Sequence, residues 1–208
     1  MKQVSFFSER IKPVIIMAVI TIICISLVSG IHLSTQELVI ANEGLVLKKA
    51  VLYAAGVEIP SGNAEVNELY EERVEEQMDE SGDVYIVYGE GGSTGGEIEA
   101  YAFIAPGPGL WGEIEMLAAF MPDLKTFAGI DFIKQNETPG LGARITEAWF
   151  KEQLRGKQPP LVMNPEGTES SASTEIDAIT GASRTSDFVL SIFNEAGLRA
   201  AELEKEGM

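Results

Sequence analysis

Residues 83–105 read DVYIVYGEGGSTGGEIEAYAFIA, with two apolar segments on either side of a glycine-rich stretch. The segments 83–88 and 97–105 are rich in Val, Ile, Tyr and Phe, which favour strands. Two such segments around a glycine-rich connection predict a β-hairpin with a long turn. The stretch 89–96 has the glycine content of a phosphate-binding loop, but a strand follows it instead of a helix, and it carries no Lys. We therefore interpret it as a turn.

The chain downstream of this hairpin predicts further strands and helices of the same domain. The expected elements are strands over 112–120 and 126–135, a helix over 146–155, a short strand at 161–163 and a last helix over 184–204. Thr146 is the expected N-cap of the first of these helices. Residues 156–175 are rich in Pro, Gly and Ser and predict a loop. Antiparallel strands with segregated helices make an α+β domain, so we expect an antiparallel sheet with flanking helices.

Upstream of the hairpin, two segments predict helices. Residues 36–56 form the first, with Gly56 as a cap beyond its end. The second spans 64–80 behind Asn63 as its N-cap, because apolar residues recur every four positions along one face. These apolar residues are Val66, Tyr70, Val74 and Met78. The opposite face is strongly acidic, and we interpret it as a solvated surface.

A long apolar segment lies near the N-terminus. From Pro13 to Leu33 there is no charged side chain, and twelve of these 21 residues are Val, Ile or Leu. A helix of that length is about 31 Å long, which matches the hydrocarbon core of a bilayer. We therefore expect one transmembrane helix over 13–33, with Cys24 packed in it as a small apolar residue. The alternative is a signal peptide cleaved near 28–30, although the apolar region of such a peptide is usually only about 7–15 residues long.

The charges that flank this segment predict its orientation. The next basic residue after it is Lys48, whereas three basic residues precede it, namely Lys2, Arg10 and Lys12. The positive-inside rule then places residues 1–12 in the cytoplasm and the domain 34–208 outside it, in the periplasm or beyond the cell membrane. Membrane lipid is therefore an expected partner of the apolar helix.

The composition excludes several kinds of chemistry. The 208 residues include one Cys and one His and carry a formal net charge of −17. One cysteine excludes an internal disulfide, a cysteine-based zinc site and an iron–sulfur cluster, and we expect no metal site. The one histidine, His32, lies in the apolar segment, which argues against a Ser-His-Asp nucleophile. The negative charge argues against nucleic acid as a partner. Redox or group-transfer chemistry would have to come from an added cofactor.

Three short motifs are candidate site residues: GPGLWG at 107–112, ETPGLG at 137–142 and DAITGAS at 177–183. In the third motif, Ser183 lies at or near the start of the final helix, where backbone N–H groups lack partners and the helix dipole adds positive potential. Such a position suits a phosphate, with Arg184 as a candidate further contact. Gly181 lets the backbone approach a ligand closely. From this turn alone, a serine is more often simply an N-cap.

Together and in this order, the apolar N-terminal segment and the three motifs resemble the covalent-FMN subunits of ion-translocating NADH:quinone reductases and Rnf complexes, the NqrC/RnfG family. The resemblance covers essentially the whole chain, and the GLW form of the first motif is closer to NqrC. In that family an exported flavin transferase, with FAD as donor, attaches FMN as a phosphoester to the last hydroxyl of the third motif. The family usually has Thr there, where this chain has Ser183.

The resemblance implies a set of cofactor-binding residues. Ser183 would carry the FMN, and Thr185 is the second candidate acceptor. The motif around the acceptor comprises Asp177, Thr180, Gly181, Ala182 and Arg184. The residues expected to line the flavin ring are Glu137, Thr138, Gly140 and Leu141, with Leu110 and Trp111 near it.

The implied function is that of a membrane-anchored electron carrier. Its flavin would exchange electrons with carriers in neighbouring membrane subunits of an ion-translocating complex, and we expect no turnover by the isolated chain. No side chain is expected to act as a catalytic acid or base, because the cofactor supplies the chemistry. Two alternatives remain open: an anchored flavin domain of another extracytoplasmic reductase, and a non-redox exported module whose glycine-rich loops bind a ligand.

Overall fold

The computed structural model of the chain describes residues 11–79 and 82–208 and divides into two units, one up to Gly44 and one from Leu45 to Met208. The first unit is the N-terminal part of helix α2 (Lys12–Ala55), which is long and apolar enough to cross a membrane. The sequence predicted separate helices over 13–33 and 36–56, but α2 is continuous. Hydroxyl groups at positions 34 and 35 bond back to carbonyl oxygens one turn earlier, so these polar residues do not break the helix.

The C-terminal end of α2 lies in the second unit and has a regular cap. Gly56 has a φ of +87°. Its N–H donates to the carbonyl of Tyr53, and the N–H of Val57 donates to that of Leu52. These two hydrogen bonds form a Schellman motif, which confirms the expected glycine cap.

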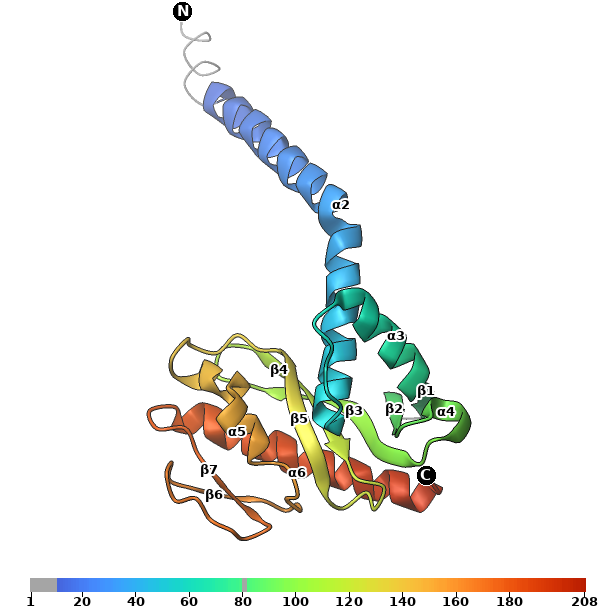
Figure 1. Cartoon of the computed structure of the whole chain (residues 1–208). Coiled ribbons are helices and arrows are strands. Elements are labelled where there is room, and N and C mark those ends of the chain that lie inside the picture. The colour runs from blue at the N-terminus through green and yellow to red at the C-terminus, as the bar shows by residue number, and fades with distance from the viewer. Residues whose placement is uncertain (1–10, 80–81) are drawn as a thin grey trace, which may run out of the picture. The chain divides into compact units, whose positions relative to one another are not determined.

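The second unit is built on an antiparallel sheet of five strands in sequential order (Figure 1). The strands are β1 (Val74–Asp79), β2 (Gly82–Tyr88), β3 (Ile98–Pro108), β4 (Glu113–Phe120) and β5 (Phe127–Lys134). Tyr85 of β2 pairs with Ala102 of β3, which in turn pairs with Ala119 of β4. The predicted hairpin and the two strands that follow it are confirmed, and so is the α+β class.

Both faces of this sheet are buried, which explains why its central strands are continuous apolar runs. Val84 and Ile86 belong to one hydrophobic core, whereas their neighbours Tyr85 and Val87 belong to the other. Helix α6 (Ser183–Glu206) covers the first face. The end of α2 and helix α3 (Asn63–Arg73) cover the second. The flanking helices therefore lie on both sides of the sheet.

The prediction of a helix over 64–80 is wrong in its second half. Helix α3 ends at Arg73, and Val74 begins β1, where it pairs with Val87 of β2. Met78 is 83% exposed and is not part of an apolar helix face. The N-cap is Gly62, and Asn63 instead accepts a hydrogen bond from Lys49 through its side chain. Pairing with the neighbouring strand therefore outweighs the helical spacing of the apolar residues.

The helix predicted over 146–155 is shorter than expected. A 3₁₀-helix, η2 (Gly142–Thr146), precedes α5 (Ala148–Glu152), and the N-cap of α5 is Glu147. The hydroxyl of Thr146 bonds back to the carbonyl of Ala143 instead of capping α5. A further single-turn helix, α4 (Gly92–Gly95), occupies the glycine-rich turn between β2 and β3.

The loop over 156–175 contains the short strand β6 (Val162–Asn164), which pairs in parallel with β7 (Glu175–Asp177). The sequence predicted the first of these strands, and it also predicts a short strand before the Thr-Gly-Ala-Ser turn at 180–183, where β7 lies. Strand β7 ends at Asp177, the first residue of the DAITGAS motif.

Candidate functional site

One buried carboxylate joins the first two sequence motifs to the helix that follows the third. Glu137, which is 5% exposed, accepts hydrogen bonds at Oε1 from the backbone N–H of Leu110 at 2.7 Å and of Trp111 at 3.2 Å. Its Oε2 accepts a bond of 2.6 Å from the hydroxyl of Thr185. The GPGLWG turn, the ETPGLG loop and the start of α6 therefore meet at Glu137.

Two glycines make room for this carboxylate. A Cβ on Gly142 would lie 2.6 Å from Thr185 Oγ1 and 2.7 Å from Glu137 Oε2. A Cβ on Gly109 would lie 2.7 Å from Glu137 Oε1. Any side chain at either position would push the hydrogen-bonded groups apart, so glycine is required there.

Three large apolar side chains are exposed around this centre. Leu110 is 46% exposed, Trp111 66% and Leu141 44%. Leu141 lies beside the third motif, because a Cβ on Gly181 would be 3.2 Å from its Cδ2. Thr138 fixes the turn below Leu141, since its carbonyl accepts the N–H of Leu141 at 3.1 Å. Gly140 has a φ of +74° in the same turn. These exposed side chains offer contacts to a flat apolar ligand.

The start of α6 has the features of an anion site. Ser183 is its first residue, and the N-cap, Ala182, gives no side-chain hydrogen bond. Within the described residues, no acceptor takes the backbone N–H of Ser183, Arg184 or Thr185. Unpaired N–H groups and the dipole of a 24-residue helix attract negative charge. The side chain of Ser183 is exposed beside them.

The neighbouring hydroxyl groups are engaged elsewhere. Thr185 is 2% exposed and donates to Glu137. Ser186 is 1% exposed, and its hydroxyl oxygen accepts the N–H of Ile179 at 3.1 Å. Of these three hydroxyl-bearing residues at the start of α6, Ser183 is the exposed one, so the geometry favours it over Thr185 as an acceptor.

The other residues expected around the acceptor have different surroundings. Asp177 is 5% exposed and accepts hydrogen bonds from the backbone of the loop between β6 and β7, away from Ser183. The N–H of Thr180 donates to Glu166 at 2.6 Å. Arg184 is exposed, and its guanidinium lies 5.6 Å from the ring centre of Phe188.

Sequence reasoning missed one pair that reaches this turn. The guanidinium of Arg144 donates to both carboxylate oxygens of Glu166, at 2.8 and 3.2 Å. The hydrogen bonds from Arg144 and then from Thr180 lower the pKa of Glu166 to about 2. Glu166 lies in a polar loop with no distinctive pattern around it, so the sequence carries no signal for this contact.

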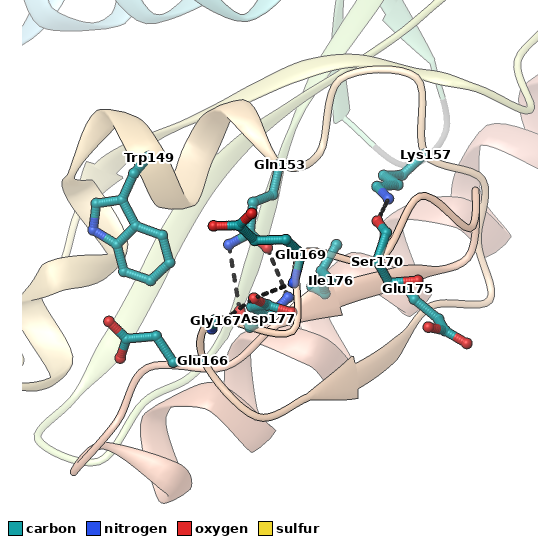
Figure 2. Close-up of a pocket in the computed structure, with 10 residues that line it drawn as sticks. All are labelled: Trp149, Gln153, Lys157, Glu166, Gly167, Glu169, Ser170, Glu175, Ile176 and Asp177. Carbon is teal, nitrogen blue, oxygen red and sulfur yellow. Dashed lines mark hydrogen bonds between the residues drawn. The ribbon is translucent and has the colours of Figure 1, made fainter.

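A cavity of about 540 Å³ lies beside the third motif (Figure 2). Trp149 and Gln153 of the α5 region form one side, and the loop that leads into β7 forms the other. Asp177 contributes to its wall, but Ser183, Leu110 and Leu141 do not. The exposed apolar residues around Glu137 are therefore not part of the lining of this cavity.

Comparisons with known proteins agree with these motifs. Residues 109–197 match the family model of the FMN-binding domain. The chain is 36% identical over 154 residues to the RnfG-type (G) component of the Na⁺-translocating ferredoxin:NAD⁺ oxidoreductase complex of Acetobacterium woodii, a match that covers 72% of this chain and 67% of that protein. It is 35% identical over 119 residues to the NqrC component of the Na⁺-translocating NADH-quinone reductase of Neisseria meningitidis serogroup A, covering 53% of this chain and 44% of that one.

The fold has a counterpart among solved structures. The crystal structure of the NqrC component of the Na⁺-translocating NADH-quinone reductase from Parabacteroides distasonis superposes with a TM-score of 0.64 at 21% identity, covering 79% of this chain and 95% of that one. The match to the A. woodii protein extends over more of both chains than the match to the N. meningitidis protein. These matches therefore do not favour the closer likeness to NqrC that the GLW turn suggested. The chain belongs to the NqrC/RnfG family, the FMN-binding subunits of Nqr- and Rnf-type ion-translocating complexes.

Proposed function

We propose that this chain carries FMN as a phosphoester on Ser183 and is an electron-carrying subunit of an ion-translocating membrane oxidoreductase. The observation that carries the proposal is the meeting of the GPGLWG turn, the ETPGLG loop and Thr185 of α6 at Glu137. Thr185 lies two residues along the chain from the exposed Ser183. The names of the A. woodii and N. meningitidis relatives support the redox complex as the setting.

The described residues fit both ends of FMN. The unpaired N–H groups of residues 183–185 would hold the phosphate, and the exposed hydroxyl of Ser183 is the attachment point. Leu110, Trp111 and Leu141 would contact the ring system, because each is exposed and each is held by a backbone hydrogen bond of its own turn or of Glu137. Glu137 is buried and accepts hydrogen bonds from the backbone of Leu110 and Trp111, so we expect it to hold these residues in place without contacting the ring itself.

Attachment requires a simple exchange of phosphate bonds. The Ser183 oxygen forms a bond to the phosphorus on the FMN side of FAD, and the bond from that phosphorus to the bridging oxygen of the pyrophosphate breaks, so that this oxygen leaves with AMP. AMP leaves and takes up the hydroxyl proton. An exported flavin transferase would supply the active site for this step.

The electron-carrying role needs little chemistry from the chain itself. Bound FMN supplies the capacity to accept one or two electrons. The side chains of Leu110, Trp111 and Leu141 would limit access of water to one part of the ring, and the buried carboxylate of Glu137 would keep those turns in place. Electrons would come from and go to carriers in other subunits, so we expect no turnover by the isolated chain.

The apolar part of α2 provides the proposed membrane anchor. Helix α2 has 44 residues, and its uncharged segment 13–33, with 21 residues, is long enough to cross the hydrocarbon core. Basic residues precede the apolar segment and are absent after it until Lys48, so we propose that residues 1–12 lie in the cytoplasm and 34–208 outside it. This orientation places Ser183 on the side of the membrane where an exported transferase acts.

The experiment is coexpression of the full chain with a flavin transferase, followed by a denaturing gel viewed for flavin fluorescence. The wild-type chain and Ser191→Ala should give a fluorescent band. Ser191 is a suitable control because it is another exposed serine of α6, and its hydroxyl only bonds back along the helix. Ser183→Ala should give a colourless band of normal abundance. A fluorescent Ser183→Ala band, or a colourless wild-type band, would contradict the proposal.

A further inference from the structure

Hydrogen bonds between side-chain carboxylates and backbone N–H groups join the loop between β6 and β7 to the segment 177–183, which we call the acceptor turn. Asp177 Oδ2 accepts the N–H of Gly167 at 2.8 Å and of Glu169 at 3.0 Å, as Figure 2 shows by dashed lines. In the other direction, Glu166 Oε2 accepts the N–H of Thr180 at 2.6 Å. The loop is therefore fixed at two points on the segment that leads directly to Ser183.

Arg144 ties this arrangement to the second motif. It follows Gly142 by two residues, and its guanidinium forms two hydrogen bonds with the carboxylate of Glu166. Its Cζ also lies 5.1 Å from the ring centre of Trp149. A bidentate Arg–carboxylate pair is directional as well as strong. It therefore fixes the orientation of the Glu166 carboxylate, which accepts the hydrogen bond from the Thr180 N–H.

The backbone N–H groups at the beginning of the acceptor turn have hydrogen-bond acceptors, whereas those at the start of α6 do not. The N–H groups of residues 177–180 donate to Gln153 Oε1, Asn164 O, Ser186 Oγ and Glu166 Oε2, respectively. Those of residues 183–185 have no acceptor in the described part of the chain. The turn is therefore hydrogen-bonded at residues 177–180 and at Ala182, whose N–H donates to the carbonyl of Ile179, and it is open at residues 183–185, where the phosphate is proposed to lie.

We propose that Arg144 and Glu166 are positioning residues for flavin attachment, which hold Thr180 by its N–H so that the Ser183 hydroxyl is presented to the flavin transferase in one conformation. This inference rests on the proposed function. Fixing a backbone segment costs conformational entropy. In this chain that cost is met on folding, so the transferase does not have to order the turn when it binds. The KM of the transferase for this chain is therefore the quantity that the pair controls.

Variants at Glu166 separate the hydrogen bond to Thr180 from the charge. Glu166→Ala removes the acceptor, and we expect the KM for the chain to rise about tenfold with kcat changed less than about twofold. Glu166→Gln keeps an oxygen that can accept the Thr180 N–H, and its KM should stay within about threefold of wild type. Arg144→Met leaves Glu166 in place but unanchored, so its KM should rise about fivefold.

The reversed pair is the sharpest variant. Arg144→Glu combined with Glu166→Arg restores opposite charges, but it places a donor where Thr180 needs an acceptor. We therefore expect no rescue of KM by this double variant. Glu204→Ala is the matched control, because it breaks another exposed ion pair, with Lys125 at 2.6 Å, at a distant part of α6. Its KM should equal that of wild type.

The measurement is the initial rate of covalent flavin incorporation into the purified full chain in detergent, with FAD, flavin transferase and a range of chain concentrations. Thermal unfolding of each variant is measured in parallel, and each variant should remain folded at the assay temperature, because one partly exposed ion pair contributes only a small share of the stability of a domain. An unchanged KM in both Glu166→Ala and Arg144→Met would overturn the inference, and so would rescue by the reversed pair. If wild-type Ser183 accepts no flavin, the proposed function fails and the inference fails with it; if wild type is modified normally and only the KM pattern differs, the inference alone fails.

Discussion

The hydroxyl of Thr185 donates a 2.6 Å hydrogen bond to the carboxylate of Glu137, 48 residues earlier in the chain, and both groups are buried. This contact joins the start of α6 to the loop that carries the exposed Leu141. It also explains why two neighbouring hydroxyl residues differ in exposure: Thr185 is buried against Glu137, whereas Ser183 is exposed.

Replacing Thr185 by Val tests this division. Valine fills the same space but cannot donate, so one oxygen of a buried carboxylate loses its partner, and we expect the free energy of unfolding to fall by about 2–3 kcal/mol. Thr185→Ser keeps the donor and should lose less than about 1 kcal/mol. Denaturant unfolding of the full chain in detergent measures both, and both variants should still accept flavin. Equal stability of Thr185→Val and wild type would contradict the structural role of the contact.

Replacing Gly142 by Ala tests the packing around Glu137. The new methyl would lie 2.6 Å from Thr185 Oγ1 and 2.7 Å from Glu137 Oε2. Neither group can retreat without losing its hydrogen bond, so we expect a loss of about 1–3 kcal/mol in stability. Gly44→Ala is the control, because it lies within α2 with no atom within 4 Å of an added Cβ. That variant should be neutral or slightly stabilising, and a similar loss in both variants would refute the steric argument.

Arg155 closes the C-terminal end of α2. Its guanidinium donates to the carbonyl oxygens of Tyr53 at 2.8 Å, Ala54 at 3.3 Å and Ala128 at 2.6 Å. Two of these are among the last carbonyls of the helix, which have no partner within it. Arg155→Met should therefore lower the free energy of unfolding by about 2–4 kcal/mol. The free energy of unfolding of Arg155→Lys should lie between those of wild type and Arg155→Met. A methionine variant as stable as wild type would show that water replaces these bonds fully.

The contribution of Glu166 to stability should depend on pH in a defined direction. Its pKa is lowered from 4.5 to about 2 by the hydrogen bonds from Arg144 and Thr180. A group whose pKa is lower in the folded chain adds stability above its unfolded value and loses that contribution as the pH falls through its folded value. The difference in thermal unfolding midpoint between wild type and Glu166→Gln should therefore have its largest value above about pH 4.5. It should decrease as the pH is lowered and vanish near pH 2. A difference that stays constant across this range would contradict the shift.

The central strands were predictable because their patterns are unambiguous. Strands β2 to β5 are apolar on both faces and are separated by clear turns, so their apolar runs are strong signals. Strand β1 was missed because it is an edge strand with the sequence VEEQMD, whose two glutamates face solvent. The apolar residues before it, Val66 and Tyr70, are properly helical, and the same spacing continued by chance into Val74 and Met78.

The candidate site was predictable in its parts but not in its connections. The three motifs and the position of Ser183 at a helix start follow from local sequence. The hydrogen bonds of Glu137 span 26 to 48 residues, and the pairing of Arg144 with Glu166 depends on a parallel strand pair that the loop sequence does not reveal. Side-chain contacts of this kind are fixed by tertiary packing, which local propensity does not encode.

Peptide mapping by mass spectrometry of the full chain, isolated after coexpression with a flavin transferase, is the most direct test. We predict that the peptide containing residues 177–186 carries one FMN phosphate ester and that fragmentation places it on Ser183. Modification of Thr185 or of any other residue, or the complete absence of flavin from this peptide, would contradict the assignment of the acceptor.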